Sequence, residues 1–342
     1  MLNRRDYILK LIIERFVQTA QPVGSKTLIE NYDLPFSSAT IRNEMQLLEN
    51  DGFLEKTHTS SGRVPSSRGY KYYIENLRDK KKNNKIKFEL QTILNERTQT
   101  IEDMLKESCE ILSEMTNLVS LVLGNNTSEE TLASLQMIPI GNNSSTVIFV
   151  TNRGAVESKT FFFDKNIKVD DLEKCIAMLN KRLVGTSVSE LVPKMRLLEP
   201  IIHDYIIDGD VIYQTILKTL GTLANDKVVM YGKEKLLDQP EFSNDPERIK
   251  DVIDLFESPT FFKEITEKVQ FIDKDITVKI GGVDERDDIS IVSAKIYIPG
   301  VGENVISLIG PKRMNYDKAY EAIETLVDEL NKKFEEISKG DS

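Results

Sequence analysis

The chain has 342 residues, a hydrophobic content of 40% and a formal net charge of −10, which are ordinary values for a soluble globular protein of two or three domains. Its only two cysteines, Cys109 and Cys175, lack paired spacing, so we expect no disulfide framework, no metal cluster and a reducing cytoplasmic setting. No apolar run approaches the roughly 18 residues of a membrane span, and we therefore expect no membrane partner.

Charge is distributed unevenly along the chain. Residues 1–87 carry 16 lysines and arginines against 10 acidic residues, a net charge of +6, which leaves the remainder at −16. A basic segment joined to an acidic remainder is expected when one domain contacts phosphates and the other does not. From charge alone, chance segregation of solvated side chains is an equally good interpretation.

Residues 1–77 predict a compact domain of short helices followed by a hairpin. Ser25 is a suitable N-cap for a short second helix, and Ser37 or Ser38 for a third helix that runs to about Asp51. The residues predicted to face the core of this domain recur at helical spacing: Ile8, Leu11, Ile12, Leu28, Ile41, Met45 and Leu48.

The third helix indicates a function. Its outward face lacks the Glu and Lys that are usual on a surface helix. It carries amides, a hydroxyl and an arginine, which can hydrogen-bond base edges in a major groove, as the second helix of a helix-turn-helix does. The side chains expected to read bases are Ala39, Thr40, Arg42, Asn43 and Gln46. Periodicity alone fits a plain three-helix core with solvated polar residues equally well.

The predicted hairpin lies beyond the third helix. Phe53–His58 predicts a strand, Ser60–Gly62 a loop tip and Arg63–Pro65 a return strand. A small uncharged tip can approach a sugar-phosphate backbone closely, and the Arg63 guanidinium suits a phosphate or a minor groove. His58 alone more often has a structural role. The residues expected at the DNA backbone or in the wing are Ser25, Lys26, Ser38, His58, Thr59, Ser60, Ser61, Arg63, Arg68 and Lys71.

Strands and helices are mixed in the rest of the chain. We expect a linker and connecting helix at 78–100, then an α+β domain at 101–170 and 236–342, interrupted by a helical insertion at 171–235. The predicted strands are 118–123, 135–140, 146–150, 156–163, 277–280, 290–298 and 303–310, and the predicted helices are 87–118 (one or a pair), 170–183, 193–223, 246–256, 259–269 and 316–337.

Several segments carry a resemblance to a known family. Pro22–Leu28, Ser38–Met45, His58–Pro65, Gly69–Tyr73 and Leu308–Tyr316 resemble the signature segments of the HrcA family of heat-inducible repressors, in order and in spacing. The resemblance is strongest in the first 77 residues and the last 40, and about 125–270 matches only loosely.

The resemblance implies both a fold and a function. The fold is a winged helix-turn-helix, then a GAF-like α/β domain with an inserted helical dimerising domain. The function is that of a homodimeric repressor of chaperone and chaperonin operons, which binds double-stranded DNA at an inverted-repeat operator and is released on heat stress. The resemblance also implies chaperonin as a modulating partner.

Other classes of function find less support in the sequence. There is no GxxxxGK[ST] loop, HExxH or CxxC motif, and the only histidines are His58 and His203, so we expect neither an enzyme nor a cofactor. RNA binding is disfavoured because no aromatic stacking platform accompanies the third helix. The alternative that stays open is a ligand-sensing winged-helix transcription regulator with a small-molecule effector in the GAF-like domain.

Overall fold

The computed structural model describes residues 2–56, 62–78, 84–94, 101–124, 130–141, 143–163, 167–205, 210–224, 228–267, 276–283, 286–298 and 302–340. The chain forms two compact units, of which the second comprises Gly124–Lys227 and Tyr297–Asn304. We call the second unit the inserted unit. In the first unit, residues up to 78 are the head and the remaining residues are the body. Among the described helices, none is both long and apolar enough to cross a lipid bilayer.

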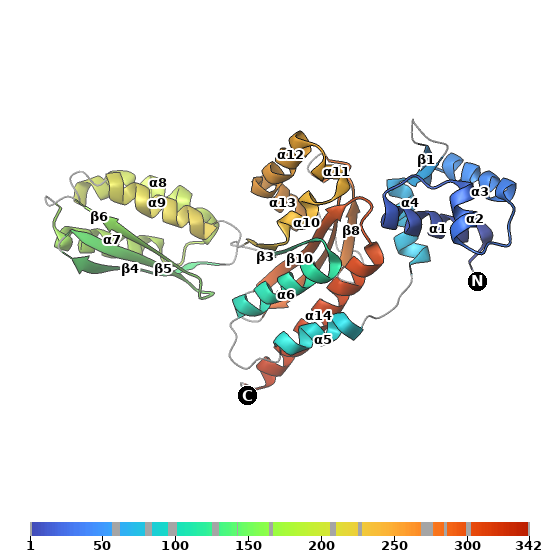
Figure 1. Ribbon diagram of the computed structural model, residues 1–342. Coiled ribbons are helices and arrows are strands. Elements are labelled where there is room, and N and C mark those ends of the chain that lie inside the picture. The colour runs from blue at the N-terminus through green and yellow to red at the C-terminus, as the bar shows by residue number, and fades with distance from the viewer. Residues whose placement is uncertain are drawn as a thin grey trace. The chain divides into compact units, whose positions relative to one another are not determined.

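The head consists of helices followed by a two-stranded hairpin (Figure 1). Each of the core residues predicted from helical spacing is buried, which confirms that part of the prediction. Ser37, not Ser38, is the N-cap of the third helix, because its side chain accepts a hydrogen bond from the Thr40 amide at 3.1 Å. The elements are α1 (Arg4–Thr19), α2 (Ser25–Asn31), α3 (Ser38–Asn50), β1 (Leu54–Lys56), β2 (Arg63–Pro65), α4 (Ser67–Tyr72) and a π-helical turn, Tyr73–Leu77.

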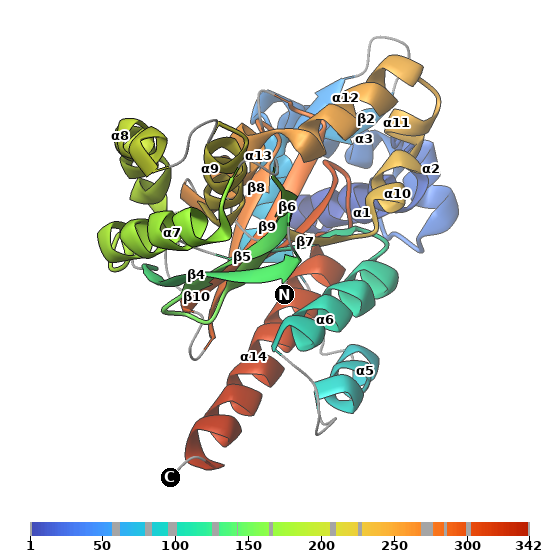
Figure 2. The same ribbon diagram turned by 90° about the vertical axis from the view of Figure 1, so that its left-hand side faces the viewer.

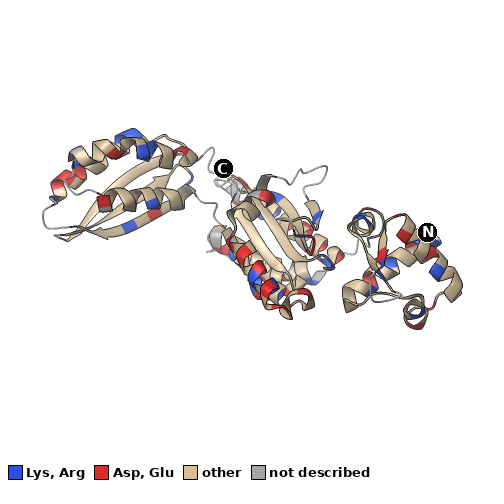
Figure 3. Ribbon diagram, turned by 90° about the horizontal axis from the view of Figure 1, so that it is seen from above, with Lys and Arg blue, Asp and Glu red and all other residues tan. Residues whose placement is uncertain are grey.

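The body is a five-stranded sheet with helices on both faces, in the strand order β7-β3-β10-β9-β8 (Figure 1). Helices α10 to α13 bury their apolar residues against one face, and α6 and α14 lie on the other. Most of the charged residues of the body lie on its helices, and few lie on its strands (Figure 3). The strands are β3 (Val119–Gly124), β7 (Val228–Tyr231), β8 (Ile276–Ile280), β9 (Ile289–Ile298) and β10 (Gly302–Pro311). The helices are α5 (Asn84–Leu94), α6 (Ile101–Thr116), α10 (Lys233–Leu237), α11 (Pro240–Ser243), α12 (Pro246–Glu257), α13 (Pro259–Glu267) and α14 (Tyr316–Gly340).

The inserted unit is a three-stranded antiparallel sheet, β4-β5-β6, with helices packed on one face (Figure 2). Leu135, Val147, Phe149 and Phe161 from the sheet share one buried cluster with apolar residues of all three helices. The elements are β4 (Leu132–Gly141), β5 (Ser144–Thr151), β6 (Val156–Phe162), α7 (Val169–Leu183), α8 (Val188–Tyr205) and α9 (Asp210–Ala224).

The α+β prediction is confirmed, and an antiparallel sheet covered by helices on both faces fits the GAF-like fold that the resemblance implied. The limits of the insertion differ from the predicted 171–235, because the long segment of the inserted unit runs from Gly124 to Lys227 and Tyr297–Asn304 joins it. The physical reason is that β4, β5 and β6 pair with one another and bury their apolar face against α7 to α9, so they belong with those helices. The predicted helix over 193–223 is in fact the pair α8 and α9.

A tight backbone contact holds α4 against the hairpin. A Cβ atom added to Gly69 would lie 2.1 Å from the carbonyl oxygen of Phe53, which is backbone and cannot step aside. We predict that Gly69→Ala destabilises the head by about 1–3 kcal/mol. Hydrogen exchange in increasing urea, followed at the amides of α4, measures the change. Gly221→Ala is the control because that helical site has open space, and it should raise local stability by about 0.5–1 kcal/mol. Unchanged protection of α4 in Gly69→Ala would contradict the packing.

Candidate nucleic-acid interface

The outward face of α3 is polar and exposed. Arg42, Asn43 and Gln46 are exposed along with Ala39, whereas Thr40 is half-buried and its hydroxyl lies 2.9 Å from that of Ser37. The Gln46 amide donates to the side chain of Asn50 at 3.2 Å. Because Ile41, Met45 and Leu48 occupy the opposite face and are buried, α3 presents its amides and its arginine on one side.

A buried carboxylate anchors α3 to the first helix. Glu44 is 7% exposed. It accepts a hydrogen bond from Arg4 Nε at 2.8 Å and another from Arg5 Nε at 3.3 Å. Burial alone would raise the pKa of Glu44, but the hydrogen bonds and positive charges of Arg4 and Arg5 outweigh it and lower that pKa. The two arginines therefore keep the carboxylate ionised and fix the angle of α3 on α1.

Arg63 joins the hairpin to α3 instead of extending freely into solvent. Its side chain is 12% exposed, and its Nη2 lies 2.6 Å from Glu49 Oε2. The same Nη2 donates to Gln46 Oε1 at 3.4 Å. The backbone of Arg63 also exchanges two hydrogen bonds of 2.9 Å with Val23, in the segment before α2. The Arg63 guanidinium thus connects the hairpin to the candidate base-reading face of α3.

The other predicted backbone contacts lie around this centre. Ser25 and Ser38, at the starts of α2 and α3, approach each other with their hydroxyl oxygens 3.2 Å apart. Lys26 and Lys71 are exposed, and the exposed Arg68 lies over the Phe53 ring at 4.8 Å. The predicted tip residues fall outside the described residues: His58, Thr59, Ser60 and Ser61.

Two residues of this surface were not predicted from the sequence. Leu47 is 41% exposed beside Gln46, where an apolar side chain could contact a thymine methyl group. Glu49 neutralises Arg63. The sequence could have indicated a role for Glu49, because an acidic residue three positions after Gln46 shares its helix face. If that face is to contact phosphates, the acidic residue needs a cation to neutralise it.

The described residues offer no alternative chemistry at this surface. No group of three or more histidine, cysteine or acidic side chains that could hold a metal ion occurs in the part of the chain that the structure describes. Cys109 and Cys175 are free and buried, and burial raises the pKa of the Cys109 thiol to about 12, so that thiol is not poised as a nucleophile.

The head has the order and geometry of a winged helix-turn-helix: two helices that both pack on a third, a polar outward face on that third helix, and a hairpin linked to it by Arg63 and Glu49. In this class of domain, the second helix of the helix-turn-helix lies in the major groove of duplex DNA. A family model for the HrcA protein C-terminal domain matches residues 102–319. The chain belongs to the HrcA family.

Named relatives cover nearly the whole chain. The heat-inducible transcription repressor HrcA of Bacillus pumilus (strain SAFR-032) is 36% identical over 337 residues, which is 97% of this chain and 97% of the relative. The protein of the same name from Halalkalibacterium halodurans is 34% identical over 337 residues, with the same coverage.

A solved structure shares the fold. A crystal structure described only as that of a hypothetical protein superposes with a TM-score of 0.62 and 22% sequence identity, and the match covers 98% of each chain. That similarity supports the fold along the full length, including the inserted unit.

We predict that Glu44→Gln lowers the free energy of unfolding of the head by about 1–3 kcal/mol at pH 7, because two arginines lose a charged partner. Since the folded pKa of Glu44 is lowered, its stabilisation is fully present above its unfolded pKa of about 4.3 and is lost as pH falls through the folded pKa. Thermal unfolding between pH 7 and pH 3 should therefore show the two proteins converging in acid. Glu30→Gln, at an exposed site on α2, should change stability by less than about 0.5 kcal/mol. A constant difference across this pH range would contradict the ion pairs.

Proposed function

We propose that this chain is a repressor of heat-shock operons, those of chaperones and chaperonins, and that it binds an inverted-repeat operator as a homodimer and leaves it on heat stress. The observation that carries the proposal is the full-length relationship to named heat-inducible repressors together with a winged helix-turn-helix whose third helix exposes amides and an arginine. A repressor family is not an enzyme class, and DNA places the site of action in the cytoplasm.

The geometry of α3 supports base reading. Asn43 is exposed on α3, and Gln46 is oriented by Arg63 and Asn50. Side-chain amides pair in two-point fashion with adenine edges, and arginine pairs in the same way with guanine. In this proposal Ala39, Thr40, Arg42, Asn43 and Gln46 read bases, and Lys26, Arg68 and Lys71 contact phosphates.

The inserted unit supports dimerisation. The face of its sheet turned away from α7 to α9 carries exposed apolar side chains, namely Ile138, Ile140, Val156 and Phe162. The register places Ile138 opposite Thr146 and Val150 opposite Val156 on this same face. Exposed apolar side chains gathered on one face of a sheet suit an interaction site, and a second copy of the same sheet would cover them symmetrically.

Recognition of a single operator in a genome also favours a two-fold symmetric dimer. One winged helix contacts too few base pairs to find a site in a genome, whereas two related heads match an inverted repeat. Release on heating then needs an element of low stability in the dimer. Chaperonin that binds a loosened form would link repression to the supply of chaperone, as the family resemblance implied.

A footprint tests the proposal. The purified full-length protein should protect an inverted repeat upstream of a chaperonin operon of the same genome, with two protected half-sites related by symmetry. Protection should disappear when the temperature is raised into the heat-shock range and return on cooling. Absence of protection upstream of every chaperone and chaperonin operon would reject the proposal.

We predict that Asn43→Ala weakens binding to the specific operator by about 1–3 kcal/mol, because one two-point contact to a base is lost. Binding to random DNA should change little, since phosphate contacts are untouched. A competition titration of operator against random duplex at fixed salt measures the ratio. Glu30→Ala, on the exposed side of α2, is the control. If Asn43→Ala keeps the specificity ratio of the unmodified protein, α3 does not read bases through this residue.

A matched pair of variants tests the dimer surface. Phe162, on the open sheet face, and Leu197, on the outer side of α8, are both 78% exposed. Phe162→Glu should convert the dimer to monomer in sedimentation velocity because it introduces a charge into an apolar contact, whereas Leu197→Glu should leave the dimer intact. Equal behaviour of the two variants would show that the open face is not the contact.

A further inference from the structure

Two of the signature segments contact each other, and of their residues only Lys71 was assigned to the DNA interface. Gly69–Tyr73 belongs to the head and starts within α4, and Leu308–Tyr316 runs from the end of β10 to the start of α14 in the body. The ring centroids of Tyr70 and Tyr316 lie 5.3 Å apart, and both side chains are buried. The two segments are separated by most of the chain, so this contact fixes where the head meets the body.

Arg313 is the most connected residue at this contact. Its Nη1 donates to the carbonyl oxygen of Val17 at 3.1 Å, and its Nη2 donates to Gln239 Oε1 at 3.0 Å and to Glu241 Oε2 at 3.2 Å. Its Nε also pairs with Glu241. Val17 lies in the last turn of α1, where a helix leaves its carbonyl groups without intrahelical partners. The Arg313 guanidinium therefore caps the C-terminal turn of α1 in the head and also binds the Glu241 carboxylate in the body.

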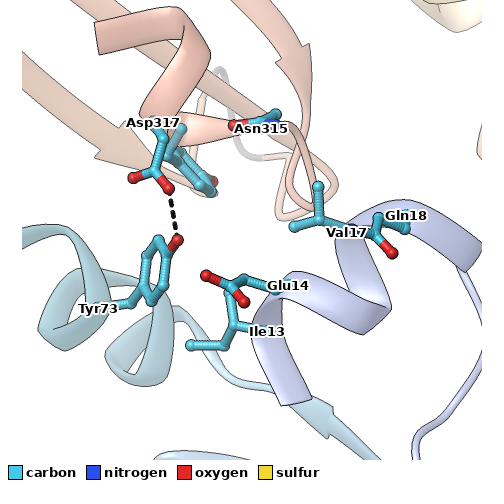
Figure 4. A pocket seen from close by; sticks show the side chains of 8 residues that line it. Ile13, Glu14, Val17, Gln18, Tyr73, Asn315 and Asp317 are labelled. Atoms are coloured by element: carbon cyan, nitrogen blue, oxygen red, sulfur yellow. Dashed lines mark hydrogen bonds between the residues drawn. The ribbon is translucent and has the colours of Figure 1, made fainter. Parts of the chain in front are cut away.

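Aromatic residues of the head flank Arg313. The Tyr73 hydroxyl donates to Asp317 Oδ2 at 2.6 Å across a small cavity that is also lined by Ile13, Glu14 and Val17 (Figure 4). Beyond it, the Arg78 guanidinium lies 3.5 Å from the centroid of the Tyr320 ring. Directional contacts therefore join the head to the body in addition to the buried Tyr70–Tyr316 pair.

The body approaches the hairpin at Glu55, Val64 and Pro65, and Arg63 stays bound to α3. Glu55 and Val64 form a cross-strand pair, and both line a cavity of about 300 Å³ together with Arg313 and Lys312 of the body. The next pair, Lys56 and Arg63, lies on the opposite face of the hairpin, where Arg63 binds Glu49. The body therefore holds the head without covering the polar face of α3.

We propose that Arg313 is a positioning residue that locks the head to the body and so sets the distance and the rotation between the two α3 helices of a dimer. A planar guanidinium with four bonds to three partners resists rotation in a way that a flexible ammonium does not. The proposal rests on the proposed function, because spacing matters only if two heads read one operator.

The experiment combines operator spacing with X-ray scattering of the free protein. The variants are Arg313→Gln, Arg313→Lys and Tyr73→Phe. The last of these removes only the hydroxyl group that donates a hydrogen bond to Asp317. The control is Arg286→Gln, because Arg286 pairs with Asp251 within the body. Affinity is measured for the footprinted inverted repeat and for a version with two base pairs inserted between half-sites, which turns one half-site by about 70°.

The unmodified protein and Arg286→Gln should bind the lengthened operator at least tenfold more weakly. Arg313→Gln should lose less than threefold on insertion, Arg313→Lys and Tyr73→Phe should be intermediate, and Arg313→Gln should show a larger maximum dimension in scattering. The proposal would be overturned if both Arg313→Gln and Tyr73→Phe kept the spacing discrimination and the scattering of the unmodified protein. If Arg313→Gln does not fold, the result for Tyr73→Phe alone decides. If no protein binds the repeat but scattering separates the variants, the lock stands and the proposed function fails.

Discussion

The Glu44 carboxylate, held inside the head by Arg4 and Arg5, is the interaction on which the rest of the head depends, because it fixes α3 on α1. The same chemistry recurs twice more, where Arg63 binds Glu49 to tie the hairpin to α3 and Arg313 binds Glu241 where head meets body. A guanidinium and a carboxylate lock an angle as well as a distance. Two of these pairs fix α3 within the head, and Arg313, paired with Glu241 in the body, reaches the head through the carbonyl oxygen of Val17.

The sequence predicted those features that depend on local spacing. The inward residues of the head recur every three or four positions, and each predicted core residue is buried; the same periodicity placed Asn43 and Gln46 on the exposed side of α3. Four strands of the body, β3, β8, β9 and β10, are mostly apolar runs, such as Ile289–Ile298, and were predicted because such runs are typical of covered sheets. The four-residue strand β7 was not predicted. These patterns are properties of a single segment and need no knowledge of its neighbours.

Features that depend on pairing between distant segments could not be predicted. The strands over 132–162 alternate as any half-covered strands do, and nothing in that pattern tells whether they extend the body sheet or form another. Likewise, an arginine in a hairpin has the same appearance in the sequence whether it reaches a phosphate or a glutamate on the next helix. The helices α10 and α11 were not predicted. They have only five and four residues, which is too short for a helical periodicity to be detected.

The connection between body and inserted unit has a consequence for synthesis of the protein. Leu123 at the end of β3 pairs with Val228 of β7, and every residue between them belongs to the inserted unit. The other neighbour of β3 is β10, which comes later still. On the ribosome, the head can therefore fold from its own residues as soon as they emerge, whereas β3 must wait uncovered for partners made much later. Contacts of this length fold slowly and expose apolar strands meanwhile, so a nascent chain acquires its reading head well before the body that directs it.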